Sequence, residues 1–317
     1  MQLEYRHYIP GDEAAIVRLW NRCLSRDPIT AERFRKLVLL DPNFDPQGMR
    51  IASADKEVIG CFYAVRRLLP MIGTELEEDR GWIPFFFVDS RYRRQGIAAR
   101  MLEEAAAYLR KHHREKLLFS GYAPNYIVPG IDRKAYPDAA VFLEKQGFQQ
   151  LYTSVAMDYS LVDYETPEEV MKLKEKRLAE GYTFACAEDS DLYELIQFAT
   201  EQFNPDWGRA IREGLLQQLQ LNQILVSRHQ GVMIGFCMHG GYEGVRERFG
   251  PFGVDPSQRG KGIGKILLHD CLQLMRAQGM HGAWFLWTGE RSPAGQLYMH
   301  SGFTITRSFD IVSKALD

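Results

Sequence analysis

One pattern, an apolar strand followed by a basic glycine-containing loop and a helix, occurs twice along this chain. Residues 85–98 carry the first version and residues 251–264 the second, and Gly96 aligns with Gly262 at the same offset as the other matching positions. A self-similar pattern of this kind restricts the fold more than any single motif, because each copy must form the same local structure. The repeat predicts two similar domains in one chain.

The flanks of the two loops also match. A helical pattern follows each loop, a short apolar strand comes next at 117–119 or 283–287, and each copy closes on a Gly-Phe pair. The starts agree too, because strand-like alternation and then helical spacing occupy residues 3–23 and 182–203. We predict an N-terminal domain over residues 1–160, a helical connector over 161–181 and a C-terminal domain over 182–317.

Each loop is expected to bind an anion at the start of its helix. The first N–H groups of a helix have no partner within the helix, and the helix dipole adds partial positive charge there. Glycines let the backbone approach a phosphate closely, and Arg259 and Lys261 add full charges in the second copy. A tight surface turn would explain one isolated loop, but two matching copies argue against it. A dinucleotide-binding loop fits less well, because the glycine spacing differs and no ribose-binding acid stands at the right distance.

The overall charge and composition of the chain limit the classes of protein to which it can belong. A net charge of −2 over 317 residues gives no support to a nucleic-acid binder, and no apolar run is long enough to cross a bilayer. The first residues lack the apolar core of a signal peptide, and the five cysteines show no metal-ligand spacing. We expect a soluble cytoplasmic protein without a bound metal or a membrane partner, and the sequence leaves its oligomeric state open.

At the level of motif, both loops resemble the acetyl-CoA loop of the GNAT N-acetyltransferase superfamily. The family pattern Gln/Arg-x-x-Gly-x-Gly/Ala is met by Arg93, Gly96 and Ala98, and again by Arg259, Gly262 and Gly264. The resemblance covers nearly the whole chain, and two-copy members such as mycothiol synthase are known. It implies an α/β fold of two tandem domains, each a mixed, twisted sheet flanked by helices, with acetyl-CoA as the acyl donor.

The resemblance further implies where acetyl-CoA would lie. In the family the fourth and fifth strands diverge, here the strands ending at Val254 and spanning 283–287 in the second copy, and pantetheine lies between them. The backbone of the fourth strand would bond that arm and polarise the thioester carbonyl, so that an amine attacks it directly without a covalent enzyme intermediate. The predicted cofactor-binding residues are Phe252, Gly253, Val254, Arg259, Gly260, Lys261, Gly262, Ile263 and Gly264, with Phe86, Val88, Arg93, Arg94, Gln95, Gly96, Ile97 and Ala98 in the first copy.

In this family a tyrosine before the closing Gly-Phe pair often protonates the departing thiolate. Tyr298 stands at that position in the second copy, and a phenol pKa of about 10 is close to that of a thiol. Leu143 takes the place in the first copy. The pattern therefore predicts catalysis in the C-terminal domain by Tyr298, with a first copy that is degenerate, structural or a second acyl-CoA site. Two alternatives stay open: Tyr298 is a core residue with its hydroxyl at the rim, or the first copy is active through Tyr122, Tyr126 or Tyr136.

A general base is harder to assign from the sequence. Glu243, Glu247 and Glu290 flank the fourth and fifth strands of the second copy, although each is also explained as a solvated surface charge. Arg291 stands where the family often has an asparagine, which leaves the positioning of the acceptor open. The predicted function is an acetyl-CoA-dependent N-acetyltransferase acting on a primary amine of a small molecule or peptide. The alternative is a non-catalytic acyl-CoA-binding or sensing protein.

Overall fold

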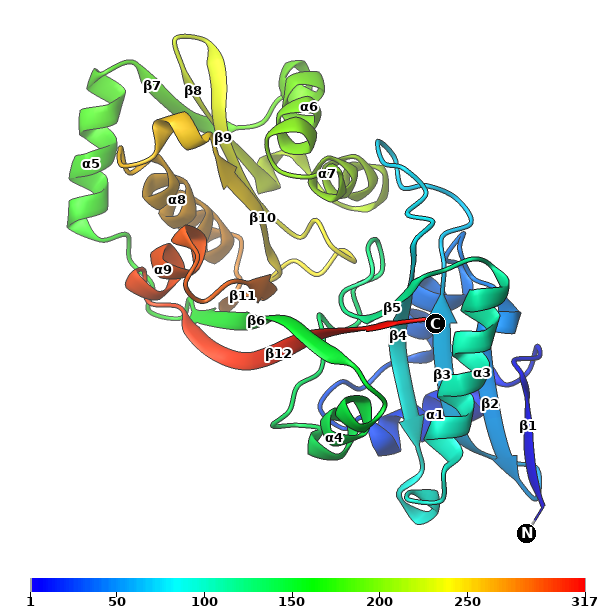
Figure 1. Ribbon diagram of the computed structural model, residues 1–317. Coiled ribbons are helices and arrows are strands. Elements are labelled where there is room, and N and C mark those ends of the chain that lie inside the picture. The colour runs from blue at the N-terminus through cyan, green and yellow to red at the C-terminus, as the bar shows by residue number, and fades with distance from the viewer. Residues whose placement is uncertain (1, 317) are drawn as a thin grey trace. The chain divides into compact units, whose positions relative to one another are not determined.

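The computed structural model describes residues 2–316, and the chain divides into two compact units (Figure 1). Unit 1 comprises Met1–Pro70, Glu75–Ser154 and Ser308–Asp317, and unit 2 comprises Met71–Thr74 and Val155–Arg307. Each unit contains one copy of the repeated strand–loop–helix pattern, and each is described by itself.

Unit 1 is built on an eight-stranded mixed sheet in the order β1-β2-β3-β4-β5-β12-β6-β11, whose last strand, β11 (Gly282–Thr288), belongs to unit 2. Its strands are β1 (Leu3–His7), β2 (Met49–Ala54), β3 (Glu57–Val65), β4 (Arg80–Val88), β5 (Lys116–Phe119) and parts of β6 (Gln149–Ser160) and β12 (Thr304–Ala315). Neighbours are antiparallel except β4 and β5, which run parallel and pair only from Arg80 to Trp82 on β4. Beyond Trp82 the two strands lose their pairing, as the resemblance to the family implied for the fourth and fifth strands.

Both faces of the unit 1 sheet are covered by helices. These are α1 (Glu13–Cys23) and α2 (Ala31–Phe34), and α3 (Ile97–Lys111) and α4 (Pro137–Lys145). Successive side chains of a strand point to opposite faces, so Phe85 and Phe87 of β4 pack against Trp20 of α1 at ring distances of 4.6 and 5.7 Å. Phe86 points the other way and meets Phe142 of α4 at 5.6 Å. The predicted helices and strands of the first copy are therefore present, and its Phe85–Phe87 run serves both sides of the sheet.

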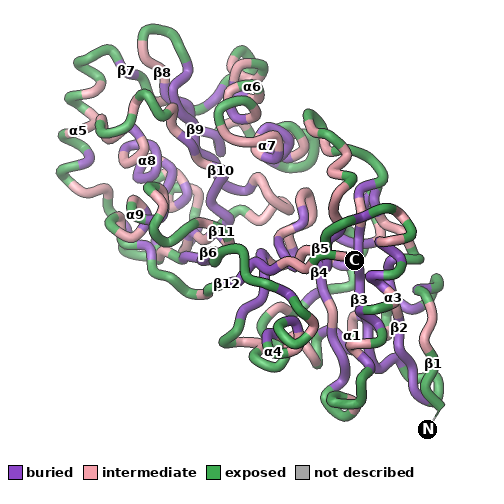
Figure 2. The backbone as a smooth tube through the Cα atoms, in the orientation of Figure 1, coloured by how far each residue is buried: buried purple, intermediate pink, exposed green. Residues whose placement is uncertain are grey.

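Unit 2 repeats the plan with the sheet divided between its fourth and fifth strands. Four strands pair in the order β10-β9-β8-β7, while β11 pairs with the second half of β6. The elements are β7 (Tyr182–Cys186), β8 (Ile224–His229), β9 (Val232–His239), β10 (Phe249–Val254), β11 (Gly282–Thr288), α5 (Glu168–Ala179), α6 (Leu192–Gln202), α7 (Pro205–Gln217), α8 (Ile263–Ala277) and α9 (Pro293–His300). One isolated parallel bridge joins Arg248, the residue before β10, to Trp284 of β11. Figure 2 shows buried residues following the inner strands in each unit.

The compact units depart from the predicted domain boundaries at the two longest strands. Both β6 and β12 have 12 residues, and unit 2 takes β6 from Val155 onward while unit 1 takes β12 from Ser308 onward. Within unit 1, Val312 pairs with Phe119 of β5; within unit 2, Ser160 pairs with Gly282 of β11. A strand this long, about twice the usual length, can contribute to both units, which a division of the chain at residues 160 and 182 does not describe.

The predicted connector forms helix α5, which packs on unit 2. Val170 is buried, and the ammonium of Lys174 lies 2.8 Å from Asp270 of α8. Among residues 2–316, no cluster of three or more His, Cys, Asp or Glu side chains is arranged to hold a metal ion. None of the helices in the same range is long and apolar enough to cross a membrane.

Candidate functional site

The loop after β4 has the backbone of an anion-binding site. The carboxylate of Asp89 accepts a hydrogen bond from the Arg91 N–H at 3.0 Å, which starts a short 3-10 turn. Arg94 and Gly96 then adopt left-handed conformations with φ of 63° and 78°. Within residues 2–316 no side chain caps the first N–H groups of α3. Alternation of right- and left-handed residues turns successive N–H groups toward one concavity, which suits a phosphate.

The loop after β10 has the same backbone in unit 2. Asp255 accepts a bond from the Ser257 N–H at 2.7 Å, and Gly260 and Gly262 have φ of 79° and 78°. No side chain of the described part of the chain caps α8. Gly260 thus stands where unit 1 has Arg94, so the first copy holds a bulky residue in a conformation that favours glycine.

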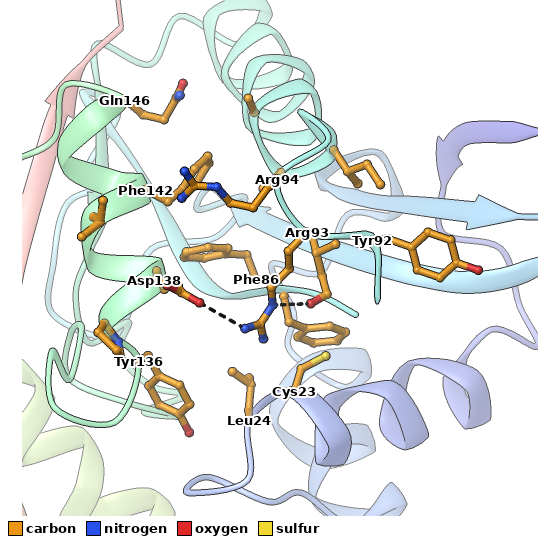
Figure 3. A pocket seen from close by; sticks show the side chains of 18 of the residues that line it. Cys23, Leu24, Phe86, Tyr92, Arg93, Arg94, Tyr136, Asp138, Phe142 and Gln146 are labelled. Carbon is orange, nitrogen blue, oxygen red and sulfur yellow. Dashed lines mark hydrogen bonds and ion pairs between the residues drawn. The ribbon is translucent and has the colours of Figure 1, made fainter. Parts of the chain in front are cut away.

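A cavity of about 470 Å³ opens beside the loop of unit 1 (Figure 3). Its walls come from the end of β4, the loop, the start of α3 and one face of α4, together with the segment after α1. Seven of the predicted first-copy residues line it: Phe86, Val88, Arg93, Arg94, Gly96, Ile97 and Ala98. Gln95 is exposed and lies outside the lining. The loop therefore borders a hollow of the size of a small-molecule site.

Arg93 ties the walls of this cavity together. Its Nε donates to the Val88 carbonyl at 3.1 Å, and its Nη1 lies 3.5 Å from the carboxylate of Asp138 at the start of α4. Figure 3 shows the guanidinium extending into the cavity between these two partners. The arginine that the family pattern requires thus places its charge inside the hollow.

The cavity is long enough to have two chemically different ends. Arg94 and Gln146 lie at one end, while Cys23, Leu24 and Tyr136 lie at the other (Figure 3). The hydroxyl of Tyr136 donates to Oδ2 of Asp27 at 2.6 Å. Burial raises the pKa of the Cys23 thiol. No motif marked Cys23, Leu24 or Asp27, whereas Tyr136 is one of the three tyrosines that the sequence offered as an alternative acid of the first copy.

Tyr298, the predicted acid of the second copy, packs inside unit 2. Its ring lies 4.6 Å from Phe285, 5.5 Å from Phe303 and 5.9 Å from Phe249, and the residue is 7% exposed. Burial, with smaller effects of two neighbouring thiols, raises the pKa of this phenol well above 10. A phenol in such surroundings gives up its proton less readily than one in water. The assignment of Tyr298 as the acid remains a prediction, and its surroundings are those of a core residue.

The second loop is braced by α5. Nε of Arg177 donates to the Lys261 carbonyl at 2.7 Å, and the Lys265 ammonium lies 2.5 Å from Glu169. A Cβ at Gly262 would stand only 2.6 Å from a methyl group of Leu173. Lys261 itself donates to Gln258 at 2.9 Å. Of the two cations predicted to serve an anion here, the Lys261 ammonium is therefore already hydrogen-bonded within its own unit.

The remaining second-copy candidates are spread over different surroundings. Phe252 is partly buried and meets Tyr298 at 6.0 Å, and Gly264 packs beneath Phe252. Of the three glutamates considered as bases, Glu243 is paired with Arg248 at 3.1 Å, whereas Glu247 and Glu290 are exposed. Arg291 is exposed as well. The structure does not gather these carboxylates into one site.

The comparisons with known proteins all indicate one family of acetyltransferases. A profile described as "Acetyltransferase (GNAT) family" matches residues 14–126, and one described as "Acetyltransferase (GNAT) domain" matches residues 220–305. A mycothiol acetyltransferase from Beutenbergia cavernae is 42% identical over 52 residues. That match spans 16% of this chain and 18% of the relative.

Solved structures with the same fold include one that is itself a tandem protein. A glucosamine N-acetyltransferase region of a fungal multi-domain β-N-acetylglucosaminidase superposes with a TM-score of 0.81 at 17% identity, over 99% of this chain and 38% of the other. A GCN5-related N-acetyltransferase from Sphaerobacter thermophilus gives 0.70 at 17% identity, over 99% and 96%. A tandem GNAT protein from the clavulanic acid biosynthesis pathway gives 0.65 at 14% identity, over 100% and 99%.

One family match falls in each copy of the repeat, and each match includes the strand, loop and helix that carry the anion-binding backbone. The family uses acetyl-CoA as its donor. This chain therefore belongs to the GNAT superfamily of acetyltransferases, as a member with two GNAT domains in tandem.

Proposed function

We propose that this chain is an N-acetyltransferase that transfers the acetyl group of acetyl-CoA to a primary amine on a small molecule or peptide. The observation that carries the proposal is the cavity of unit 1, which begins at the uncapped start of α3 and continues along Phe86–Val88 of β4. This is the path predicted for the pyrophosphate and the pantetheine arm, and its walls have the polarity that each part requires.

The residues of unit 1 fit the parts of acetyl-CoA in order. The N–H groups at the start of α3 and the charge of Arg94 suit the pyrophosphate. Phe86, Val88 and Phe142 give the cavity apolar walls suited to the pantetheine arm. When bound, acetyl-CoA supplies an activated acetyl group through its thioester. Backbone N–H groups of β4 that lack a strand partner on the β5 side are available to stabilise the carbonyl oxygen as an amine attacks.

The choice between the two copies depends on the surroundings of Tyr298 and of the second loop. Tyr298 and the intact glycines of the second loop favour catalysis in the C-terminal copy, as the sequence predicted. The buried, aromatic surroundings of Tyr298 and the bracing of the loop by α5 favour a supporting role instead. We place the donor and the chemistry in unit 1, and assign to unit 2 a second acyl-CoA site or a structural role.

The test combines thiol release with calorimetry. Wild-type protein is offered acetyl-CoA and a panel of amines, and CoA binding is measured for wild type, Gly96→Glu and Gly260→Glu. Both glycines have a left-handed φ and open space around a would-be Cβ, so the two variants carry matched strain. Gly262 is unsuitable, because a side chain there would collide with Leu173.

We expect Gly96→Glu to weaken the tightest CoA site at least 100-fold, because a carboxylate would face the pyrophosphate, and Gly260→Glu to leave that site intact. Loss of the tightest site in Gly260→Glu alone would place the donor in unit 2. Tight CoA binding with no thiol release for any amine would favour the non-catalytic, sensing alternative.

A further inference from the structure

A tyrosine lies at the end of the unit 1 cavity away from the phosphate loop. Tyr136 lines this end and directs its hydroxyl to Asp27, which lies on the segment between α1 and α2 (Figure 3). Resting on the proposed function, we propose that Tyr136 is the proton donor to the departing thiol in unit 1, and that Asp27 positions it.

The course of the cavity indicates where the sulfur of acetyl-CoA would lie. If the pyrophosphate lies at the start of α3, the pantetheine arm follows β4 past Phe86, and its sulfur comes to the opposite end. Leu24 and Cys23 form part of the wall there, and Tyr136 is partly buried within it. The position four residues before the closing glycine, where the family often has its tyrosine, is Leu143, buried in the core. Tyr136 therefore supplies, from the preceding loop, a hydroxyl that α4 lacks.

The backbone around Tyr136 is fixed before any ligand binds. Oδ1 of the buried Asp132 accepts bonds from the N–H groups of Lys134 and Ala135 at 3.0 and 2.9 Å. The Tyr136 N–H donates to the Asp132 carbonyl at 2.8 Å. Helix α4 begins at the next residue, Pro137, whose ring suits the first helical position. Tyr136 is thus held between a tight turn and a helix start.

Asp27 is held with similar precision from the other side. Its carbonyl accepts a bond from Nε1 of the fully buried Trp20 at 2.7 Å, and its N–H donates to the Leu24 carbonyl at 2.9 Å. The backbone that carries this carboxylate is therefore anchored to the core of unit 1. A rigid partner of this kind fixes the rotamer of a catalytic side chain.

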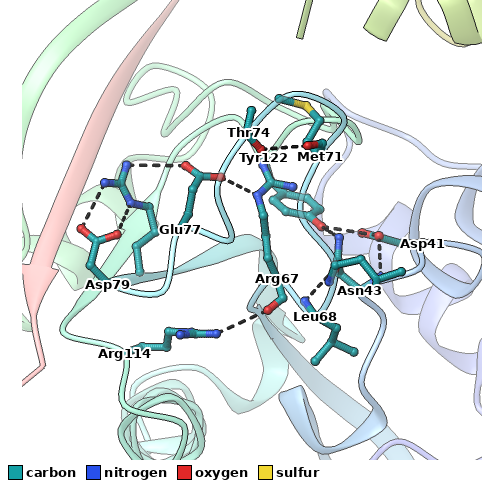
Figure 4. Close-up of polar contacts among 12 residues, drawn as sticks. Asp41, Asn43, Arg67, Leu68, Met71, Thr74, Glu77, Asp79, Arg114 and Tyr122 are labelled. Atoms are coloured by element: carbon teal, nitrogen blue, oxygen red, sulfur yellow. Dashed lines mark hydrogen bonds and ion pairs between the residues drawn. The ribbon is translucent and has the colours of Figure 1, made fainter. Parts of the chain in front are cut away.

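The loop that carries Tyr136 is bound to unit 1 near both of its ends. Near its start, the buried hydroxyl of Tyr122 accepts a bond from Nδ2 of Asn43 at 2.8 Å and donates to Asp41 at 3.4 Å (Figure 4). Near its end, Ile131 exchanges backbone bonds of 2.9 Å with Asp310 of β12. The loop is thus fixed to unit 1 before it reaches Ala135 and Tyr136, which line the cavity.

The proton transfer balances without another reagent. The nitrogen of a neutral amine forms a bond to the thioester carbon, and the C–S bond breaks with its electron pair remaining on sulfur. The Tyr136 O–H turns from Asp27 to the sulfur and gives it the proton. The new amide nitrogen carries one proton too many, and this proton restores the Tyr136 hydroxyl directly or through a water molecule. The products are the amide and free CoA thiol.

The first experiment measures contact between Tyr136 and sulfur without using activity. The affinities of CoA and desulfo-CoA, which lacks the sulfur, are measured by calorimetry for wild type and Tyr136→Phe. If the hydroxyl touches the sulfur, wild type should prefer CoA over desulfo-CoA by about threefold to tenfold, the range of one hydrogen bond, and Tyr136→Phe should lose that preference. The matched control is Tyr152→Phe, on the exposed part of β6 and outside the cavity lining, which should keep it.

The second experiment separates chemistry from binding. Tyr136→Phe should lower kcat about 100-fold or more while KM for acetyl-CoA changes less than threefold, as expected for the loss of a general acid. Asp27→Asn should lower kcat about tenfold, with KM again nearly unchanged, because the phenol remains but is oriented less well.

The outcomes are distinguishable from failure of the proposed function. Absence of CoA binding and of thiol release in wild type would overturn the proposed function and this inference together. If CoA binds and amines are acetylated, but Tyr136→Phe keeps both the sulfur preference and kcat, only the inference is overturned. Loss of the sulfur preference in Cys23→Ala or in Tyr298→Phe, with Tyr136→Phe unaffected, would assign the contact to that residue instead.

Discussion

Leu143 and Tyr298 occupy the same place in two copies of one fold, and their surroundings agree although their chemistry differs. Each lies four residues before the closing glycine, on α4 or α9, and each points into the core of its unit at 1% and 7% exposure. Helix geometry and packing set the direction of a side chain at this position, and the residue type does not change it. A match to a family motif therefore locates a side chain in the fold without showing that it meets the substrate.

The two phosphate loops share one backbone conformation but differ in charge. Arg94 and Gly260 adopt the same left-handed backbone, with φ of 63° and 79°, but only Arg94 adds a charge beside a cavity. A non-glycine residue in this conformation costs about 1 kcal/mol or more. Strain retained at a cavity wall is typical of functional sites, so this comparison favours unit 1, whereas the comparison of Leu143 with Tyr298 favours neither unit.

The largest expected effect comes from deleting residues 308–317, which asks which copy depends on the end of β12. The deletion removes Phe309, Ile311 and Val312, all buried in unit 1, at about 1.5–3 kcal/mol each. That loss is comparable to the entire stability of a typical domain. We expect hydrogen exchange to show loss of protection in β5 and in the loop before α4, although the deleted residues follow the second copy.

Strands β8–β10 of unit 2 provide the internal control for this deletion, since they lie in a separate four-stranded sheet. They should retain most of their protection. Earlier or greater loss in β8–β10 than in β5 would show that the end of β12 supports unit 2 instead.

The next effect tests the similarity of Leu143 and Tyr298 as core residues. Leu143→Ala should destabilise the protein by about 2–5 kcal/mol and Tyr298→Ala by about 3–5 kcal/mol, because each leaves a cavity in a packed cluster. Denaturant unfolding with a separate probe in each unit measures both. A cost below about 1 kcal/mol for Tyr298→Ala would mean that its ring lies in an open cleft, as a catalytic tyrosine requires.

The smallest effect sharpens the comparison of the loops. Arg94→Gly should relieve the left-handed strain and stabilise unit 1 by about 0.5–1 kcal/mol, while weakening CoA binding through loss of a charge. Arg94→Ala is the control that removes the charge and keeps the strain. Equal stability of the Gly and Ala variants in thermal unfolding would contradict the idea that the loop stores strain.

Local patterns explain why so much of the fold was predictable. Helix α1 (Glu13–Cys23) lies within the predicted segment 3–23, and β10 ends at Val254 as expected. Both follow from the spacing of apolar residues along a short stretch of chain. The loops were found for the same reason, since Gly96 and Gly262 stand at fixed offsets from their strands. Seven of the eight first-copy residues predicted from that short motif and its strand line the cavity of unit 1.

The rest depends on contacts between residues far apart in the chain. Asp27 and Tyr136 meet across 109 positions, and no spacing rule connects them. The aromatic surroundings of Tyr298 arise from β10, β11 and Phe303, the residue before β12. The pairing of β12 with β5 could not be predicted either, because alternation of apolar residues identifies a strand but does not say which strand it pairs with.

The pairing of β12 with β5 also has a consequence for how the protein is made. About 190 residues separate Phe119 from Val312, its partner in the sheet. At translation rates of about 5–20 residues per second, β5 emerges from the ribosome roughly 10–40 s before the strand that covers its edge. During that interval a nascent chain carries an open strand edge, which is a site for mispairing with other chains. The copy that is synthesised first is thus the one that finishes folding last.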